Sequence, residues 1–257
     1  MIFLYENNNI NPYGLSQILK YSYEIYRNNF QHICWISLCV FTPFLIIRQL
    51  IPSYANFSET SDVLQPFINS ADLQWLSFSV FTAMMFEPLA IAAITYITLS
   101  HFTKKEVTLP GILDASLMKW GKLLATAIVY FTALLLPFMT FILAWISIYL
   151  MIAIAFYANV VAVTDKWGIA ALLFSRNLVR GKWLSTLWKL GIINSTFFLL
   201  DMLISTSIAV MFENAILYVI LYAITRIFFS YFYVANAVIF VNYFTMSQKA
   251  EEETKYL

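Results

Sequence analysis

The sequence has few of the residues from which enzymes build active sites. It contains only two cysteines, two histidines and six glycines. Cys34 and Cys39 are five positions apart in one apolar run, so they fall on different faces of a helix and do not suit a disulfide or a metal pair. The histidines form no His-Glu-x-x-His pattern, and there is no glycine-rich phosphate loop. We therefore expect no enzyme activity, no metal site and no cofactor.

Charged residues are also scarce, and this indicates the class of protein. They make up 11% of the chain, whereas hydrophobic residues make up 61% and the mean hydropathy is +0.75. Soluble domains average roughly 25% charged and about 45–50% apolar residues. A chain of this composition has too little polar surface to cover a globule in water. We expect an integral membrane protein whose partners include membrane lipids, and the net charge of +1 gives no indication of nucleic acid.

The apolar runs predict an all-α integral membrane protein with six transmembrane helices. A span needs roughly 20 residues, and these runs are continuous, whereas barrel strands alternate and are shorter. The run from Leu123 to Val163 has no charged residue over 41 positions, so it should form two spans joined near Pro137–Thr140. The predicted spans are 31–51, 73–102, 122–139, 141–163, 185–211 and 216–244.

The distribution of Lys and Arg predicts which side of the membrane each connection faces. The connection at 52–72 and the turns near 138–141 and 212–216 contain no basic residue. The remaining connections hold nearly all the positive charge, a pattern typical of cytoplasmic loops, which places both termini in the cytoplasm. The basic residues on that side are Lys20, Arg27, Lys104, Lys105, Lys119, Lys122, Lys166, Arg176, Arg180, Lys182, Lys189, Lys249 and Lys255.

A short phrase recurs before the pairs of spans. Residues 21–30 (YSYEIYRNNF) and 174–183 (FSRNLVRGKW) align without a gap on Ser22 and Ser175, and a weaker copy surrounds Ser116. Apolar or small residues precede each serine at the helical spacing i, i+3, i+4. We predict three hairpins, each preceded by a short amphipathic interfacial helix, which we call an elbow. The single membrane domain, 1–257, would then contain repeat units at about 14–102, 108–163 and 167–244, followed by a flexible cytoplasmic tail at 245–257.

The third elbow is the most basic of the three. Arg176, Arg180 and Lys182 cluster there, whereas the first copy has only Arg27, at the position of Arg180. Anchoring at the lipid head groups would explain all three elbows, and docking of a partner or ligand is the alternative. If one elbow binds something, we expect it to be the third.

Three ionisable residues lie deep in the predicted spans: Glu87, Asp201 and Arg226. A charge in the bilayer interior is costly unless it is paired. Asp201 and Arg226 both lie about 18 Å from the turn between the last two spans, at a rise of 1.5 Å per residue, and Glu87 reaches a similar depth. They could form a structural ion pair with Glu87 protonated or joined to it, or a polar pathway for a substrate or proton. Four asparagines could add hydrogen bonds between spans: Asn159, Asn194, Asn236 and Asn242.

Two segments carry a resemblance to a known family. Residues 160–183 (VVAVTDKWGIAALLFSRNLVRGKW) and 15–30 (LSQILKYSYEIYRNNF) resemble the YciC-type family of uncharacterised bacterial inner-membrane proteins. The chain is also similar to the membrane domain found in some glycerophosphodiester phosphodiesterases. The resemblance implies a six-span, multi-pass protein of the bacterial cytoplasmic (inner) membrane, and it brings no catalytic residues.

Three classes of function stay open. The lack of a catalytic constellation favours a non-enzymatic accessory or scaffold protein, acting with a membrane-protein partner in envelope, export or immunity processes. The alternative is a small transporter or channel that uses Glu87, Asp201 and Arg226. A second alternative is an intramembrane enzyme acting on lipids, for which an acid pair is necessary but not sufficient.

Overall fold

The computed structural model describes residues 12–50, 70–139, 144–211 and 215–255, and over these residues it contains helices and connections but no strand. The all-α class is thereby confirmed. The helices are α1 (Leu15–Asn28), α2 (Phe30–Leu50), α3 (Ser70–Thr103), α4 (Leu109–Met118), α5 (Trp120–Met139), α6 (Ala144–Ala153), α7 (Tyr157–Val163), α8 (Ile169–Val179), α9 (Trp183–Met211) and α10 (Ala215–Lys255).

Among the described residues, five helical segments are long and apolar enough to cross a membrane. We predicted six, and the remaining predicted span, 31–51, falls on α2, which has 21 residues and of which Phe30–Pro43 is apolar among the residues whose side chains the structure describes. Most of the predicted connection at 52–72 and much of the two turns near 138–141 and 212–216 lie outside the described residues. The five segments are Met84–Thr103, Trp120–Pro137, Trp145–Val163, Trp183–Ile208 and Val219–Ala250.

A short helix lies at each of the three positions where the repeated phrase predicts one. The short helices α1, α4 and α8 each precede a long helix, and this long helix begins at an aromatic residue: Phe30, Trp120 or Trp183. Aromatic rings prefer the boundary between water and lipid, so they suit the point where a chain turns into a membrane. Of the three elbows only α1 has a strongly amphipathic character, whereas α4 and α8 are weakly amphipathic, which corrects the expectation of three amphipathic helices.

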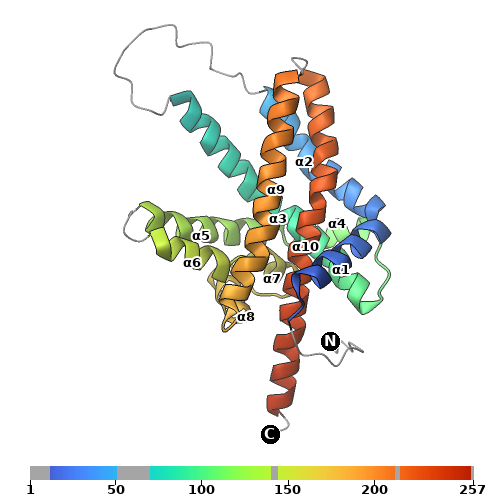
Figure 1. The fold of residues 1–257 in the computed structure, drawn as a ribbon, viewed down its shortest axis with the longest axis vertical. Coiled ribbons are helices and arrows are strands. Elements are labelled where there is room, and N and C mark those ends of the chain that lie inside the picture. The colour runs from blue at the N-terminus through green and yellow to red at the C-terminus, as the bar shows by residue number, and fades with distance from the viewer. Residues whose placement is uncertain (1–11, 51–69, 140–143, 212–214, 256–257) are drawn as a thin grey trace.

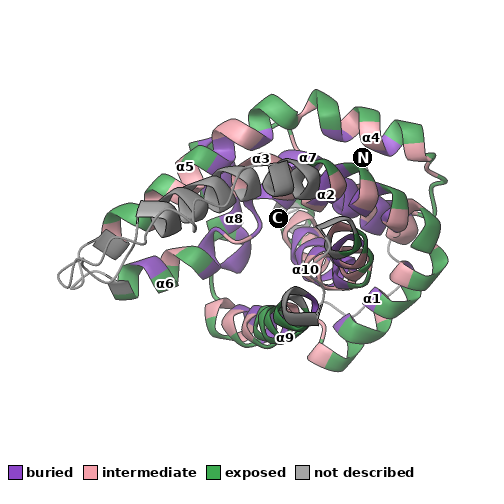
Figure 2. Ribbon diagram, turned by 90° about the horizontal axis from the view of Figure 1, so that it is seen from above, coloured by how far each residue is buried: buried purple, intermediate pink, exposed green. Residues whose placement is uncertain are grey.

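Helix α10 forms the centre of the molecule. Seen from above, the other helices surround it, and it contacts α1, α2, α3, α8 and α9 (Figure 2). Its residues Val234, Ala235, Val238 and Phe240 are fully or almost fully buried although they point in different directions around the helix. The middle of α10 is therefore a core helix that is apolar and buried on all sides. The exposed apolar residues in its first half include Ile220, Ile224 and Phe228.

The helices do not form one parallel bundle. In Figure 1, α9 and α10 run side by side along the long axis of the molecule, whereas α5 and α6 lie across this axis. Helices α5 and α6 contact each other, and α6 also contacts α8 and α9. The third elbow, α8, is thus placed where the second and third repeat units meet.

Two predicted elements need correction. The predicted span 141–163 is interrupted after Ala153, and α7 begins only at Tyr157. The predicted flexible tail at 245–257 is helical as far as Lys255, because α10 continues through it. The segment 248–255 (QKAEEETK) is rich in Gln, Lys, Ala and Glu, which favour helix once a helix has been started.

Candidate functional site

The serine of each elbow is completely buried, but the third serine is bonded differently. The hydroxyls of Ser22 and Ser116 donate to the carbonyl oxygen four residues earlier in their own helix, at 2.6 and 2.8 Å. Ser175 instead joins α8 to the break between α6 and α7. Its hydroxyl donates to the Ala153 carbonyl at 3.2 Å and accepts the N–H of Phe156 at 3.1 Å. These bonds replace helical bonds, which explains why the predicted span is interrupted there.

Replacing Ser175 by Ala should lower the free energy of unfolding by about 1–3 kcal/mol, because the buried Phe156 N–H loses its acceptor. The matched variants Ser22→Ala and Ser116→Ala should change it by less than about 0.5 kcal/mol, since their hydroxyls only bond carbonyls within their own helices. Unfolding of the purified protein in detergent measures all three. Equal losses in the three variants would contradict this assignment.

The connection after the third elbow is longer than the other two. Only Asn29 separates α1 from α2 and only Lys119 separates α4 from α5, whereas three residues, Arg180 to Lys182, separate α8 from α9. Gly181 in the middle has a φ of 76°, a left-handed conformation that glycine adopts without strain. This wider turn leaves space beside the end of α8.

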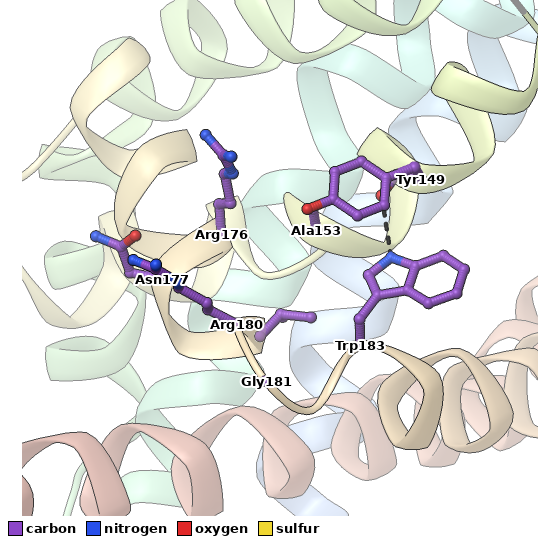
Figure 3. A pocket seen from close by; sticks show the side chains of 8 residues that line it. Tyr149, Ala153, Arg176, Asn177, Arg180, Gly181 and Trp183 are labelled. Atoms are coloured by element: carbon purple, nitrogen blue, oxygen red, sulfur yellow. Dashed lines mark hydrogen bonds between the residues drawn. The ribbon is translucent and has the colours of Figure 1, made fainter.

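A pocket of about 290 Å³ fills that space, and we call it the third-elbow pocket. Its lining comes from the end of α8, the turn to α9 and one face of α6. Figure 3 shows two arginines and an amide on one side and two aromatic rings on the other. The lining residues are Tyr149, Ala153, Arg176, Asn177, Val179, Arg180, Gly181 and Trp183.

The two rings of the pocket are fixed in place. The indole N–H of Trp183 donates to the carbonyl oxygen of Tyr149 at 3.3 Å, as the dashed line in Figure 3 shows. The rings of Tyr149 and Trp183 are stacked, with centroids 5.7 Å apart and planes inclined by 25°. Trp183 thus joins the start of α9 to α6 and forms a firm apolar wall opposite Arg176 and Arg180.

The predicted basic cluster is divided by the structure. Arg176 and Arg180 line the pocket, but Lys182 does not. The ammonium group of Lys182 lies 5.0 Å from the centre of the Tyr243 ring, and that of the buried Lys189 lies 5.5 Å from it. Lys182 therefore joins the α8–α9 turn to α10, where cation–π attraction partly replaces its lost hydration.

Stability should rise with pH because of Lys182. Desolvation by burial, followed by the positive charge of Lys189, lowers the pKa of Lys182 below its ordinary value of 10.5. Between the lowered pKa and 10.5 the unfolded chain binds more protons than the folded protein, so the free energy of unfolding increases with pH in this window. Lys182→Met should reduce the increase, to which Lys119 also contributes, and Lys20→Met, at an exposed position, should leave it unchanged. Identical pH profiles of thermal unfolding for the wild type and Lys182→Met would contradict the prediction.

Lys119, the basic residue of the second elbow, has a structural role. Its ammonium group donates to the carbonyl oxygens of Val161, Ala162 and Thr164 at 3.1, 2.7 and 2.9 Å. These carbonyls belong to the end of α7, where carbonyl groups have no N–H donor within the helix and a positive charge is favourable. Desolvation is the main influence on the pKa of Lys119, which is lowered.

Within the candidate spans, the structure places Asp201 and Arg226 in an ion pair between α9 and α10. One guanidinium nitrogen of Arg226 lies 3.2 Å from each carboxylate oxygen of Asp201. The guanidinium also contacts the hydroxyl and ring of Tyr222, one turn earlier on α10. Both charged side chains are mostly buried, with 15% exposure for Arg226 and 24% for Asp201.

Glu87 is bonded to a different partner. Its carboxylate accepts a hydrogen bond of 2.9 Å from the hydroxyl of Tyr233 on α10. The ring of Phe197 lies between the two groups, 6.1 Å from the Tyr233 ring and 6.0 Å from the guanidinium carbon of Arg226. The three predicted residues thus occupy one region of the protein, but they form two separate bonded groups.

The four asparagines connect elements, as their positions in the predicted spans indicated. Asn159 donates to Thr95 at 2.8 Å, and Asn236 donates to Asn194 at 3.0 Å. Asn242 accepts the backbone N–H of Tyr13 at 3.1 Å. The predicted role in joining helices is confirmed for Asn159, Asn194 and Asn236, whereas Asn242 joins α10 to the segment before α1.

The sequence interpretation missed three tyrosines. Tyr222 lies four residues before Arg226, a spacing that brings two side chains together on a helix and could have been noticed. The roles of Tyr149 and Tyr233 depend on contacts with distant segments, of which a sequence gives no local signal. All three place a polar hydroxyl or an aromatic face beside charged groups.

The five apolar segments and the polar bonds between them indicate a helical membrane protein with two candidate sites, the paired groups within the spans and the third-elbow pocket. No protein-family model, curated protein or solved structure matches the chain.

Proposed function

We propose that the chain is a multi-pass membrane protein with a non-enzymatic accessory or scaffold function. One observation carries this proposal: every acid and asparagine in the five candidate spans is bonded to another group of the same chain. Groups that are bonded in this way hold helices together and are not free to carry a substrate. The bonded sets are Glu87 with Tyr233, Asp201 with Arg226, Asn159 with Thr95, Asn194 with Asn236, and Asn242 with the backbone of Tyr13.

The position of the pockets supports the same function. The third-elbow pocket lies at the end of α8, and a second pocket of about 430 Å³ lies between the end of α1 and the α3–α4 connection. Neither pocket is lined by Glu87, Asp201 or Arg226. Concave surfaces at the ends of short helices suit contacts with partners beside the membrane better than passage through it.

The proposal includes a topology of six spans in three hairpins with both termini in the cytoplasm of a bacterium. The short helix before each pair of long segments supports the hairpins, and in the second unit the second of these segments is divided into α6 and α7. The absence of Lys and Arg from 52–72 and from the turns near 138–141 and 212–216 supports the orientation. Membership of the YciC-type family stays a prediction.

Cross-linking in cells followed by affinity purification and mass spectrometry tests the accessory function. We expect one membrane protein to be enriched with the tagged chain and not with an unrelated multi-pass protein carrying the same tag. The same partner should be recovered with the double variant Asp201→Asn/Arg226→Gln, provided that this variant is stably folded. Recovery of bulk lipid alone would contradict the proposal.

A transporter is the second candidate, and the polar groups of α3, α9 and α10 in one region are the observation that favours it. The test is the flux of ions or solutes into vesicles that contain the wild type or the variant Asp201→Asn/Arg226→Gln. Loss of flux in a stably folded variant would support the transporter and overturn a purely structural role of Asp201 and Arg226.

A further inference from the structure

We propose that the third-elbow pocket binds a phosphate group, carried by the head group of an anionic phospholipid or present as a free phosphate. The inference does not depend on the accessory function, because a phosphate site could serve any of the classes considered above. It depends on the side chains that line the pocket, on the availability of Arg176 and Arg180, and on the position of the pocket at the start of the candidate span Trp183–Ile208.

The lining has the chemistry that recognises phosphate. A guanidinium presents planar N–H donors that match phosphate oxygens two at a time, and an amide adds further donors. Arg176 and Arg180 are four residues apart, so they face the same side of the end of α8, and Asn177 also lines the pocket. The lining includes no acidic residue.

The two arginines are available for a ligand. In the part of the chain that the structure describes, neither guanidinium has an ion pair or a side-chain hydrogen bond. The neighbouring basic residues are engaged elsewhere: Lys182 lies against Tyr243, and Lys119 is bonded to the end of α7. The positive charge of Arg176 and Arg180 is therefore not compensated by any residue of the pocket lining.

The size of the pocket favours a small anionic group. Pockets for drug-sized ligands hold about 300–1,000 Å³, and a volume of about 290 Å³ lies just below this range. A phosphate with its attached glycerol is a suitable occupant by size, with the phosphate at Arg176 and Arg180 and the carbon atoms against Tyr149 and Trp183.

The surroundings suit a lipid. Trp183 is the first residue of the candidate span Trp183–Ile208, and Tyr149 lies in the segment Trp145–Val163. Beyond Trp183, α9 continues with Leu184 and Trp188, which are 66% and 69% exposed. Acyl chains could lie on this apolar surface while the head group occupies the pocket.

The other elbows do not have this set of residues. In the first elbow, Tyr23 and Glu24 stand at the positions of Arg176 and Asn177, so the carboxylate of Glu24 would repel an anion. In the second elbow, the same positions hold Leu117 and Met118, and a glycine replaces the second arginine. Arg27 aligns with Arg180 but lacks the other pocket residues. It is therefore a matched control within the same chain.

The test uses the purified full chain in detergent. Native mass spectrometry compares retention of phosphatidylglycerol with that of zwitterionic phosphatidylcholine, and thermal unfolding with and without inorganic phosphate at constant ionic strength tests the free anion. We expect preferential retention of phosphatidylglycerol if a lipid is the source. A rise in the unfolding midpoint with inorganic phosphate alone would identify free phosphate.

Whether the phosphate belongs to a lipid or is free, Arg176→Gln/Arg180→Gln should weaken its binding at least tenfold, roughly the effect of losing one charge-assisted hydrogen bond. Arg176→Lys/Arg180→Lys keeps the charge without the planar donors and should bind phosphate more weakly than the wild type. This variant replaces the Gln variant in the test if the Gln variant does not fold. Arg27→Gln should bind as the wild type does. Unchanged binding in the double variants, or an equal loss in Arg27→Gln, would overturn the proposal.

Discussion

Replacing Arg226 by Gln or Asp201 by Asn should each lower the free energy of unfolding by about 3–5 kcal/mol, because each change leaves the other charge buried without its partner. The pair is only 3.2 Å apart and largely buried between α9 and α10, where lipid and protein offer no alternative hydration. Reversible unfolding of the purified protein in mixed micelles, or the shift of its thermal midpoint, measures the loss.

The double variant Arg226→Gln/Asp201→Asn distinguishes pairing from a simple loss of packing. Two neutral polar groups can hydrogen-bond to each other, so the double variant should be more stable than the sum of the two single losses predicts. Glu87→Gln is a matched control, because the hydroxyl of Tyr233 can donate equally well to an amide oxygen. Strict additivity of the two single changes would show that the residues do not stabilise the protein as a pair.

Lys119→Met should lower the free energy of unfolding by about 2 kcal/mol or more, at least the effect of losing one hydrogen bond to a charged group. Three carbonyl oxygens at the end of α7 lose their common donor, while the apolar stem of the side chain is preserved. Thermal unfolding measures the global effect, and hydrogen exchange of the amides in α7 measures whether the loss is local.

Lys122→Met, one turn further on and exposed, removes the same charge from the same end of α5. Its effect should stay within about 0.5 kcal/mol, as for most surface substitutions. Similar losses for Lys119→Met and Lys122→Met would mean that general electrostatics, and not the bonds to α7, stabilise this elbow.

The features that could be predicted from the sequence are those encoded by neighbouring residues. Apolar runs predicted the helical class, and the repeated phrase predicted a short helix before each pair of spans, as α1, α4 and α8 show. Equal distance from a turn suggested that Asp201 and Arg226 lie level with each other, and the two residues are paired in the structure. The basic cluster at the third elbow indicated the region in which the pocket was found.

The features that were missed depend on contacts between distant segments. The break after Ala153 follows from bonds to Ser175 in α8, and the role of Lys119 follows from the carbonyls of α7. Lys182 leaves the basic cluster because the ring of Tyr243, about sixty positions later, attracts it. The order of charges along the chain could not indicate that Lys182, and not Arg176 or Arg180, would contact a distant ring instead of lining the pocket.

Helix α10 has 41 residues and no proline, so it is a continuous rod of about 61 Å at 1.5 Å per residue, twice the roughly 30 Å of a bilayer core. From Arg226 to Lys255 the rod measures about 43 Å by the same rise. Because Val234, Val238 and Phe240 are buried among the surrounding helices, this part of the rod can tilt only together with its neighbours. A rearrangement at the ion pair of Asp201 and Arg226 would therefore be passed to the helices packed around α10, and not to α10 alone.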